Sequence, residues 1–215
     1  MGKNRLLVLI SSMFLMMILC SSCEKEEFWS DTYYWDGDEK VAIKPIGNKS
    51  YVAYQTSDED KLIAELSKNG LSLTKVMKGN LLSSFDSPSE EAQLLLSDYK
   101  TAIIEGDCRK LESVRPYTIC CMSCYLRLSD GRELTPDFLF FAKLKSGSDS
   151  KQVEKLAKKY NVVIVGVDDF INCHELVCTN ESKGNSIEIA NKFYESGLFE
   201  YAIPNISGLG EITNF

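Results

Sequence analysis

The chain has 215 residues and a formal net charge of -7 at pH 7, because 31 acidic side chains outnumber 24 lysines and arginines. This acidic balance excludes the basic class of nucleic-acid-binding proteins, since contacts to phosphates require a cationic surface. The length allows one or two small domains, and we expect no nucleic-acid partner.

The N-terminal residues have the composition of an export signal. Lys3 and Arg5 give a positive start, residues 6–19 form an apolar run, and small residues follow. The run falls short of the roughly 20 residues that a membrane-spanning helix needs. We therefore predict a signal peptide over residues 1–22, whose removal takes away two cations and no acid and changes the charge from -7 to -9.

Ser21 and Ser22, directly before Cys23, resemble a lipobox, the processing signal of bacterial lipoproteins. The resemblance implies that Cys23 carries the lipid and begins the mature chain; Cys20 is the alternative acceptor, in a poorer small-residue context. The acidic start "CEKEEF" resembles the signal that sends such lipoproteins to the cell surface. We expect an outer-membrane lipoprotein that is anchored by its lipid and faces either the periplasm or the outside.

Residues 23–40 are acidic and aromatic and predict a tether in front of the folded part. Aromatic side chains in such a segment form either an adhesive surface or, more often, the cover of a domain's flank. We favour the second interpretation for Trp29, Tyr33, Tyr34 and Trp35.

The region 41–109 is predicted to form a first α+β module. Its expected elements are an edge strand at 41–46, a strand at 50–56, a helix at 57–70, strands at 71–77 and 80–85, a helix at 87–99 and a strand at 100–107. Ser57 and Asp60 suggest a capping box, and Lys78 with Gly79 suggests a hairpin between the two middle strands.

The region 138–206 gives the same order of elements more clearly. The expected elements are a strand at 138–145, a helix at 148–160, a hairpin of strands at 162–168 and 172–179, a helix at 185–197 and a last strand at 198–203 that Pro204 ends. Residues 110–137 are expected to form a connecting hairpin or arm with its turn at 129–131, and 207–215 a C-terminal tail.

Both modules therefore have the order β-α-β-β-α-β, the split arrangement of ferredoxin-like modules. The sequence predicts an α+β protein with two such modules in tandem, each an antiparallel sheet with helices on one face.

A search for catalytic groups finds none that completes a site. The only histidine, His174, lies on an expected strand next to Cys173, and adjacent strand residues point to opposite faces. Asp168 and Asp169 lie at an expected turn, where aspartates commonly accept local backbone hydrogen bonds. We expect no enzyme activity, no cofactor and no small-molecule substrate.

Six cysteines follow the lipobox pair: Cys108, Cys120, Cys121, Cys124, Cys173 and Cys178. Export permits disulfides, and their pairing is left open. A single histidine and the lack of a second Cys-x-x-Cys motif disfavour a metal site, so buried thiols are the preferred interpretation.

The C-terminal half resembles the N-terminal prodomain of subtilisin-like serine proteases of gut Gram-negative anaerobes. The segments that carry the resemblance are "VEKLAKKYNV" at 153–162, "SKGNSIEIANKFYESGLFEYA" at 182–202 and "PNI" at 204–206, with weaker support from "YVAY", "NGLSL" and "IIEGD" upstream. In that family a catalytic domain follows, whereas here only eleven residues follow Pro204.

The resemblance implies a binding role, because such prodomains pack their sheet on the protease and insert a C-terminal tail into its active-site cleft. It implies a subtilisin-like serine protease as the partner, bound in trans and inhibited or assisted in folding. The residues expected to contact this partner are Tyr201, Ile203, Pro204, Asn205, Ile206 and Leu209. Two alternatives remain open: a surface or structural lipoprotein that binds another envelope or host protein, and a truncated remnant of a protease precursor.

Overall fold

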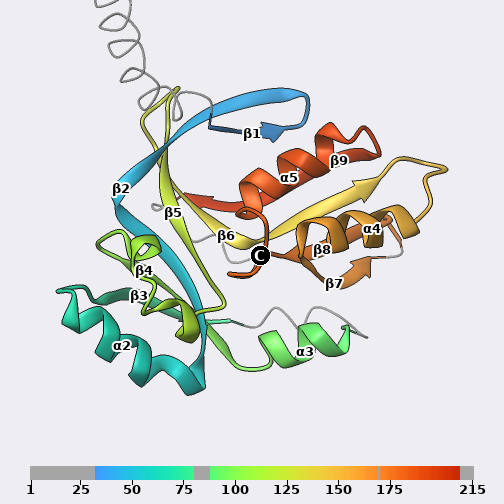
Figure 1. Ribbon diagram of the computed structural model, residues 1–215. Coiled ribbons are helices and arrows are strands. Elements are labelled where there is room, and N and C mark those ends of the chain that lie inside the picture. The colour runs from blue at the N-terminus through green and yellow to red at the C-terminus, as the bar shows by residue number, and fades with distance from the viewer. Residues whose placement is uncertain (1–31, 80–87, 169, 209–215) are drawn as a thin grey trace, which may run out of the picture. The chain divides into compact units, whose positions relative to one another are not determined.

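A computed structural model of the protein describes residues 32–79, 88–168 and 170–208 (Figure 1). These residues form an α+β fold in which all strand pairs are antiparallel. Within the described residues no helix is both long and apolar enough to cross a membrane. The residues on which the signal peptide and the acylated Cys23 were predicted lie outside the described part.

The C-terminal module has the strand order of a ferredoxin-like fold, β9-β6-β8-β7. Its elements are β6 (Glu133–Leu144), α4 (Lys151–Tyr160), β7 (Val163–Asp168), β8 (Cys173–Val177), α5 (Ser186–Glu195) and β9 (Phe199–Gly208). This confirms the predicted β-α-β-β-α-β order and the hairpin between β7 and β8.

The helix α5 begins and ends where local chemistry favours it. Asn185 and Glu188 form a reciprocal capping box at the start of α5. Gly197 follows the helix with φ 78°, a left-handed conformation in which glycine has no steric penalty. Buried Phe193 of α5 packs on Phe140 of β6, with ring centroids 5.1 Å apart.

The N-terminal module repeats the same strand order as β3-β4-β2-β5. Its elements are β2 (Glu39–Gln55), α2 (Glu59–Lys68), β3 (Leu73–Lys78), α3 (Glu90–Leu96), β4 (Tyr99–Ile104) and β5 (Cys120–Arg127). The crossover from β4 to β5 contains two 3₁₀ turns, 108–110 and 115–117, and α3 lies between β3 and β4.

Several predicted boundaries of this half were wrong. The strands expected at 41–46 and 50–56 are one long strand, β2, because its two ends pair with β5 on either side of an irregularity. The strand β3 pairs with β4; its expected hairpin partner, 80–85, lies outside the described residues. The capping box at Ser57 does not form, since α2 begins at Glu59 without a side-chain cap.

The expected connecting arm, 110–137, contributes a strand to the N-terminal module. Its first part contains β5, which pairs with β2 from Ile43↔Arg127 to Ala53↔Cys120. The hairpin predicted around 129–131 is confirmed, because β5 and β6 pair at Tyr125↔Leu134 on either side of that turn. This short pairing links the strands of the two modules.

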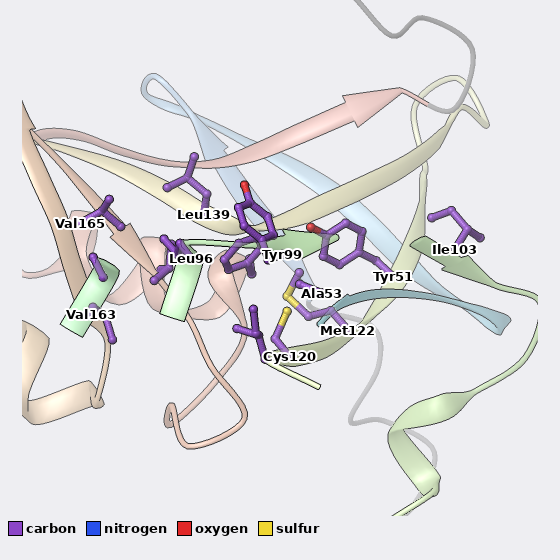
Figure 2. Packing of buried hydrophobic residues seen from close by; sticks show 14 of the residues in the cluster. Tyr51, Ala53, Leu96, Tyr99, Ile103, Cys120, Met122, Leu139, Val163 and Val165 are labelled. Atoms are coloured by element: carbon purple, nitrogen blue, oxygen red, sulfur yellow. The ribbon is translucent and has the colours of Figure 1, made fainter. Parts of the chain in front are cut away.

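A shared core joins the two modules. Alternation along β2 places Val52 and Tyr54 under α2, and Tyr51 and Ala53 on the opposite face of the sheet. That opposite face meets residues of the C-terminal module in one cluster, which includes Leu139, Val163, Val165 and Val177 (Figure 2). The sheet face of the C-terminal module that α4 and α5 leave open is therefore covered by the N-terminal module.

The segment expected as a tether contains a strand, β1 (Tyr33–Asp36), which forms a hairpin with the start of β2. Figure 1 shows β1 beside α5. The Trp35 ring packs on Tyr194 of α5 at 4.9 Å, so the aromatic side chains of β1 cover a flank of the module, as predicted. Trp29 lies outside the described residues.

Candidate functional site

Five of the six residues predicted to contact a partner lie in β9: Tyr201, Ile203, Pro204, Asn205 and Ile206. The sixth, Leu209, lies outside the described residues. The predicted end of the strand at Ile203 was wrong, because Pro204 pairs with Phe140 and pairing continues to Gly208↔Leu134. A proline fits an edge strand, since the missing N–H can face away from the ladder. Among the described residues β9 pairs only with β6, so its outer edge has no strand partner there.

The two faces of β9 have different surroundings. Pro204 is buried, and Ile206 packs against a cluster that contains Ile43 and Leu134. Asn205 points to the other face, where its amide donates to Asp137. This alternation places Pro204 and Ile206 on the face towards α5, and Ile203, opposite Phe141, on the same face as Asn205.

A pocket of about 260 Å³ lies beside the outer edge of β9. We call it the edge pocket; its lining comprises Tyr34, Trp35 and Asp36 of β1, Arg127 of β5, Arg132 and Leu134, and Ile203, Pro204 and Ile206 of β9. The fold thus brings three of the predicted contact residues together with aromatic and cationic side chains that are far away in the sequence.

The cationic side of the edge pocket is held in place by Asp130. Its carboxylate accepts hydrogen bonds from Arg127, including one from Nε at 2.9 Å, and Arg132 Nε lies 3.8 Å away. Arg127 holds the pKa of Asp130 well below its usual range. Burial raises the pKa of Tyr34, although a hydrogen bond with Arg127 acts in the opposite direction. The edge pocket therefore offers two guanidinium groups on an otherwise acidic protein.

The aromatic side of the edge pocket is fixed to α5. Trp35 Nε1 donates to Glu195 at 3.2 Å, and Asn191 donates to the backbone carbonyl of Tyr33 at 2.7 Å. The Lys40 ammonium lies 4.1 Å above the Tyr33 ring and 5.0 Å above the Trp35 ring. These contacts give the edge pocket one preorganised wall.

The residues considered for catalysis do not assemble into a nucleophile–base pair in the described part of the chain. His174 is buried on β8, opposite Ala142 on one side and Val167 on the other. The side chain of Cys173 points to the opposite face of the strand, where its Sγ accepts a hydrogen bond from the Tyr201 hydroxyl at 3.6 Å. Burial raises the pKa of this thiol. A raised thiol pKa opposes nucleophilic chemistry, since the thiolate is the reactive form.

Asp168 has the backbone role that its position at a turn suggested. Its Oδ1 accepts from the N–H groups of Phe170 and Ile171 at 3.0 and 3.3 Å. Asp169 lies outside the described residues.

One disulfide forms, between Cys108 and Cys121, and joins a 3₁₀ turn to β5. The remaining cysteines of the described residues are buried free thiols: Cys120, Cys124, Cys173 and Cys178. Cys173 and Cys178 are not bonded to each other. The described residues contain no group of three or more side chains suited to hold a metal ion.

No protein-family model and no curated protein matches the chain. Among solved structures, the acetolactate synthase small subunit from Thermotoga maritima matches with a TM-score of 0.24 and 8% identity, over 76% of this chain and 98% of that one. The ligand-free regulatory subunit of aspartate kinase from Thermus thermophilus matches with a TM-score of 0.22 and 10% identity, over 72% and 95%. TM-scores this low carry no argument about function.

Sequence reasoning missed Tyr34, Arg127 and Arg132 as neighbours of β9. No local motif marks them, since their proximity depends on the pairing of β1 with β2 and of β5 with β6. The one usable signal was the turn after Arg127, which predicted the hairpin that places both arginines together.

Proposed function

We propose that the protein is a lipid-anchored binding protein without catalytic activity of its own, which recognises an extended segment of a partner protein at β9. The observation that carries this proposal is the juxtaposition of the outer edge of β9 with the edge pocket. An extended segment that lies along a strand edge gains main-chain hydrogen bonds, and a neighbouring pocket selects its side chains.

The partner class we propose is a subtilisin-like serine protease. Its support is the resemblance of residues 153–162 and 182–202, which form α4, α5 and the start of β9. A prodomain-like protein without a catalytic domain would bind such a protease in trans and inhibit it or assist its folding.

The docking surface must differ from that of the prodomains it resembles. Those prodomains pack their sheet on the protease, but here Leu139, Val163 and Val177 bury that face against the N-terminal module. We therefore place the contact at the outer edge of β9 and the residues that follow it. The same burial favours the second candidate function, a surface lipoprotein that binds another envelope or host protein at this edge.

An inhibition assay tests the proposal. The full mature chain, from Cys23 onward, is added in excess to several subtilisin-like proteases, and peptide hydrolysis is followed. We expect inhibition of at least one protease and a loss of about ten-fold or more in potency for Ile203→Asp, which puts a charge at the edge pocket.

The matched control is Val167→Asp on β7, the strand at the opposite edge of the same sheet. The Val167→Asp variant should inhibit with the same potency as the unchanged protein. If the protein in excess inhibits none of the proteases, a subtilisin-like protease is not its partner. If both variants lose the same inhibitory potency, β9 is not the binding site.

A further inference from the structure

A second, separate pocket lies on the other side of β9. Its volume is about 440 Å³, within the 300–1,000 Å³ that small-molecule sites commonly have. Tyr51 and Ile103, at the end of the shared core away from Val163 and Val165 (Figure 2), form one wall. Thr135 and Asp137 of β6, with Asn205 and Ser207 of β9, form the facing wall.

One carboxylate lies in this pocket, held in a defined position. Asp137 is located where the register between β6 and β9 shifts, between Pro136 and Phe140. Its Oδ1 accepts from the Tyr51 hydroxyl and from the N–H of Phe138, each at 2.6 Å, and its Oδ2 accepts from Asn205 at 3.3 Å. Because a carboxylate accepts about four hydrogen bonds, Oδ2 retains the capacity to accept another.

This carboxylate has no cationic partner among the described residues: each ion pair found there involves other acids. Burial raises the pKa of Asp137, which is the cost of withdrawing its charge from water. The hydrogen bonds from Tyr51 and Asn205 orient the group without neutralising it. A half-buried carboxylate of this kind attracts a cation, since the lowered local dielectric weakens the competition from water.

The rest of the lining is mainly apolar, with two further polar side chains, Thr101 and Lys75. Lys75 is exposed, and none of the ion pairs found among the described residues involves it. Ala102 and Ile103 of β4 are buried, whereas Val76 and Met77 of β3 remain 46% and 45% exposed at the rim. Apolar walls with a few fixed polar groups are typical of ligand sites, and exposed apolar side chains at a rim extend the surface that a ligand covers.

We propose that this pocket binds a small amphiphilic molecule that carries a protonated amine on an apolar body, with the amine at Asp137 and the body against Ile103, Val76 and Met77. The complementarity of charge selects an ammonium group over a carboxylate, and the apolar lining selects an aliphatic or aromatic body. The molecule is a ligand and not a substrate, and of the residues predicted to contact a partner only Asn205 also lines this pocket.

The test uses octylamine, octanol and octanoate, three probes of equal chain length that differ in charge. Each is titrated into the full mature chain, and binding is followed by calorimetry and by amide chemical shifts. We expect octylamine to bind best and to shift the amides of Ile103, Asp137 and Asn205. Equal binding of octylamine and octanoate, or no binding of octylamine at millimolar concentration, would overturn the proposal.

Two pairs of variants locate the amine. Asp137→Asn keeps the shape of the side chain and should weaken octylamine binding about ten-fold or more, because a hydrogen bond to a charged group is lost. Octanol binding should stay unchanged, and Glu154→Gln on the exposed face of α4 is the charge-matched control. An unchanged affinity of Asp137→Asn for octylamine would contradict the proposal.

The second pair keeps Asp137 intact and so remains informative if Asp137→Asn fails to fold. Ser207→Lys places an ammonium group at the exposed rim of the pocket, where it competes with the ligand for the carboxylate. Ser207→Gln is its neutral control of similar size. We expect only the lysine variant to lose octylamine binding, and an equal response of both variants would refute an amine at Asp137.

Discussion

Pro204 of β9 lies opposite Phe140 of β6, and both residues are buried. The proline therefore belongs to the sheet and does not mark the end of the folded chain. Residues as far as Gly208 pair with β6, at the position of Leu134. Any role of the C-terminus in binding a partner must be compatible with this pairing.

Truncation tests the structural role of these residues. A chain that ends after Ala202 loses the pairing of β9 with Leu134, Thr135, Pro136, Phe140 and Phe141 and exposes their apolar surface. We expect its thermal unfolding midpoint to fall by about 4–8 °C, the shift that a loss of about 2 kcal/mol produces in a domain of this size. A chain that ends after Gly208 keeps the whole of β9 and is the control. Equal midpoints for the two truncations, by circular dichroism, would show that this part of β9 is dispensable.

The contact of Trp35 with Tyr194 should contribute measurably to the attachment of β1. The rings lie 4.9 Å apart and tilted by 42°. We expect a double-mutant cycle with Trp35→Ala and Tyr194→Ala to give a coupling of about 1 kcal/mol in the free energy of unfolding. A control cycle pairs Trp35→Ala with Tyr117→Ala, a residue in a 3₁₀ turn of the N-terminal module. This cycle should give a coupling near zero. A coupling near zero in both cycles would mean that β1 is not held by this pair.

The disulfide between Cys108 and Cys121 closes a loop with a sequence separation of 13. Cross-linking a loop of this length stabilises a protein by about 3 kcal/mol. We expect reduction, or replacement of both cysteines by alanine, to lower the free energy of unfolding in urea by about that amount. Reductant should have no further effect on the double alanine variant. The four free thiols of the described residues are buried, so they should react with a thiol reagent only after unfolding.

The half-buried Glu175 predicts a pH dependence of stability. Its partial burial, and next the charge of Asp168, raise its pKa to about 7 from a usual 4.5. The folded state therefore binds a proton at Glu175 more tightly than the unfolded state does, and protonated Glu175 stabilises the fold. This contribution to the free energy of unfolding is complete below about pH 4.5 and is lost as the pH rises through about 7. We expect this group to account for about 1 kcal/mol between pH 4.5 and 8, after allowance for its partial exposure.

The variant Glu175→Gln should lack this part of the slope and should be more stable than the unchanged protein at pH 8. Glu200→Gln, an exposed change on β9, should keep the slope. Identical pH profiles of the unchanged protein and Glu175→Gln, from urea unfolding at each pH, would show that Glu175 titrates normally.

The C-terminal module was largely predictable because its signals are local. The apolar stripe through Val153 and Ala157 predicted α4, and Gly197 predicted the end of α5. The N-terminal module was less predictable, since the strand expected at 100–107 as its last is its third, β4, and the fourth strand, β5, comes from the expected connecting arm. Its pairing with β2 depends on contacts distant in sequence, which periodicity cannot show.

The candidate sites were predictable only in part. The resemblance indicated Ile203, Pro204 and Ile206, and the fold places them in the edge pocket. The edge pocket's arginines, and the pocket of Asp137, depend on the tertiary pairing of β6 with β5 and β9. No spacing in the sequence carries that information, because these elements are separated by helices and turns.

Hydrogen exchange of β9 in the presence of a partner tests the central claim most directly. The chain from Cys23 onward is mixed with a subtilisin-like protease that the inhibition assay identifies, and exchange of the backbone amides is compared with that of the free chain. Binding along the outer edge predicts slower exchange of the β9 amides that face away from β6, between Glu200 and Ser207, with β7 at the opposite edge unchanged. Inhibition with unchanged exchange in β9 would contradict the claim.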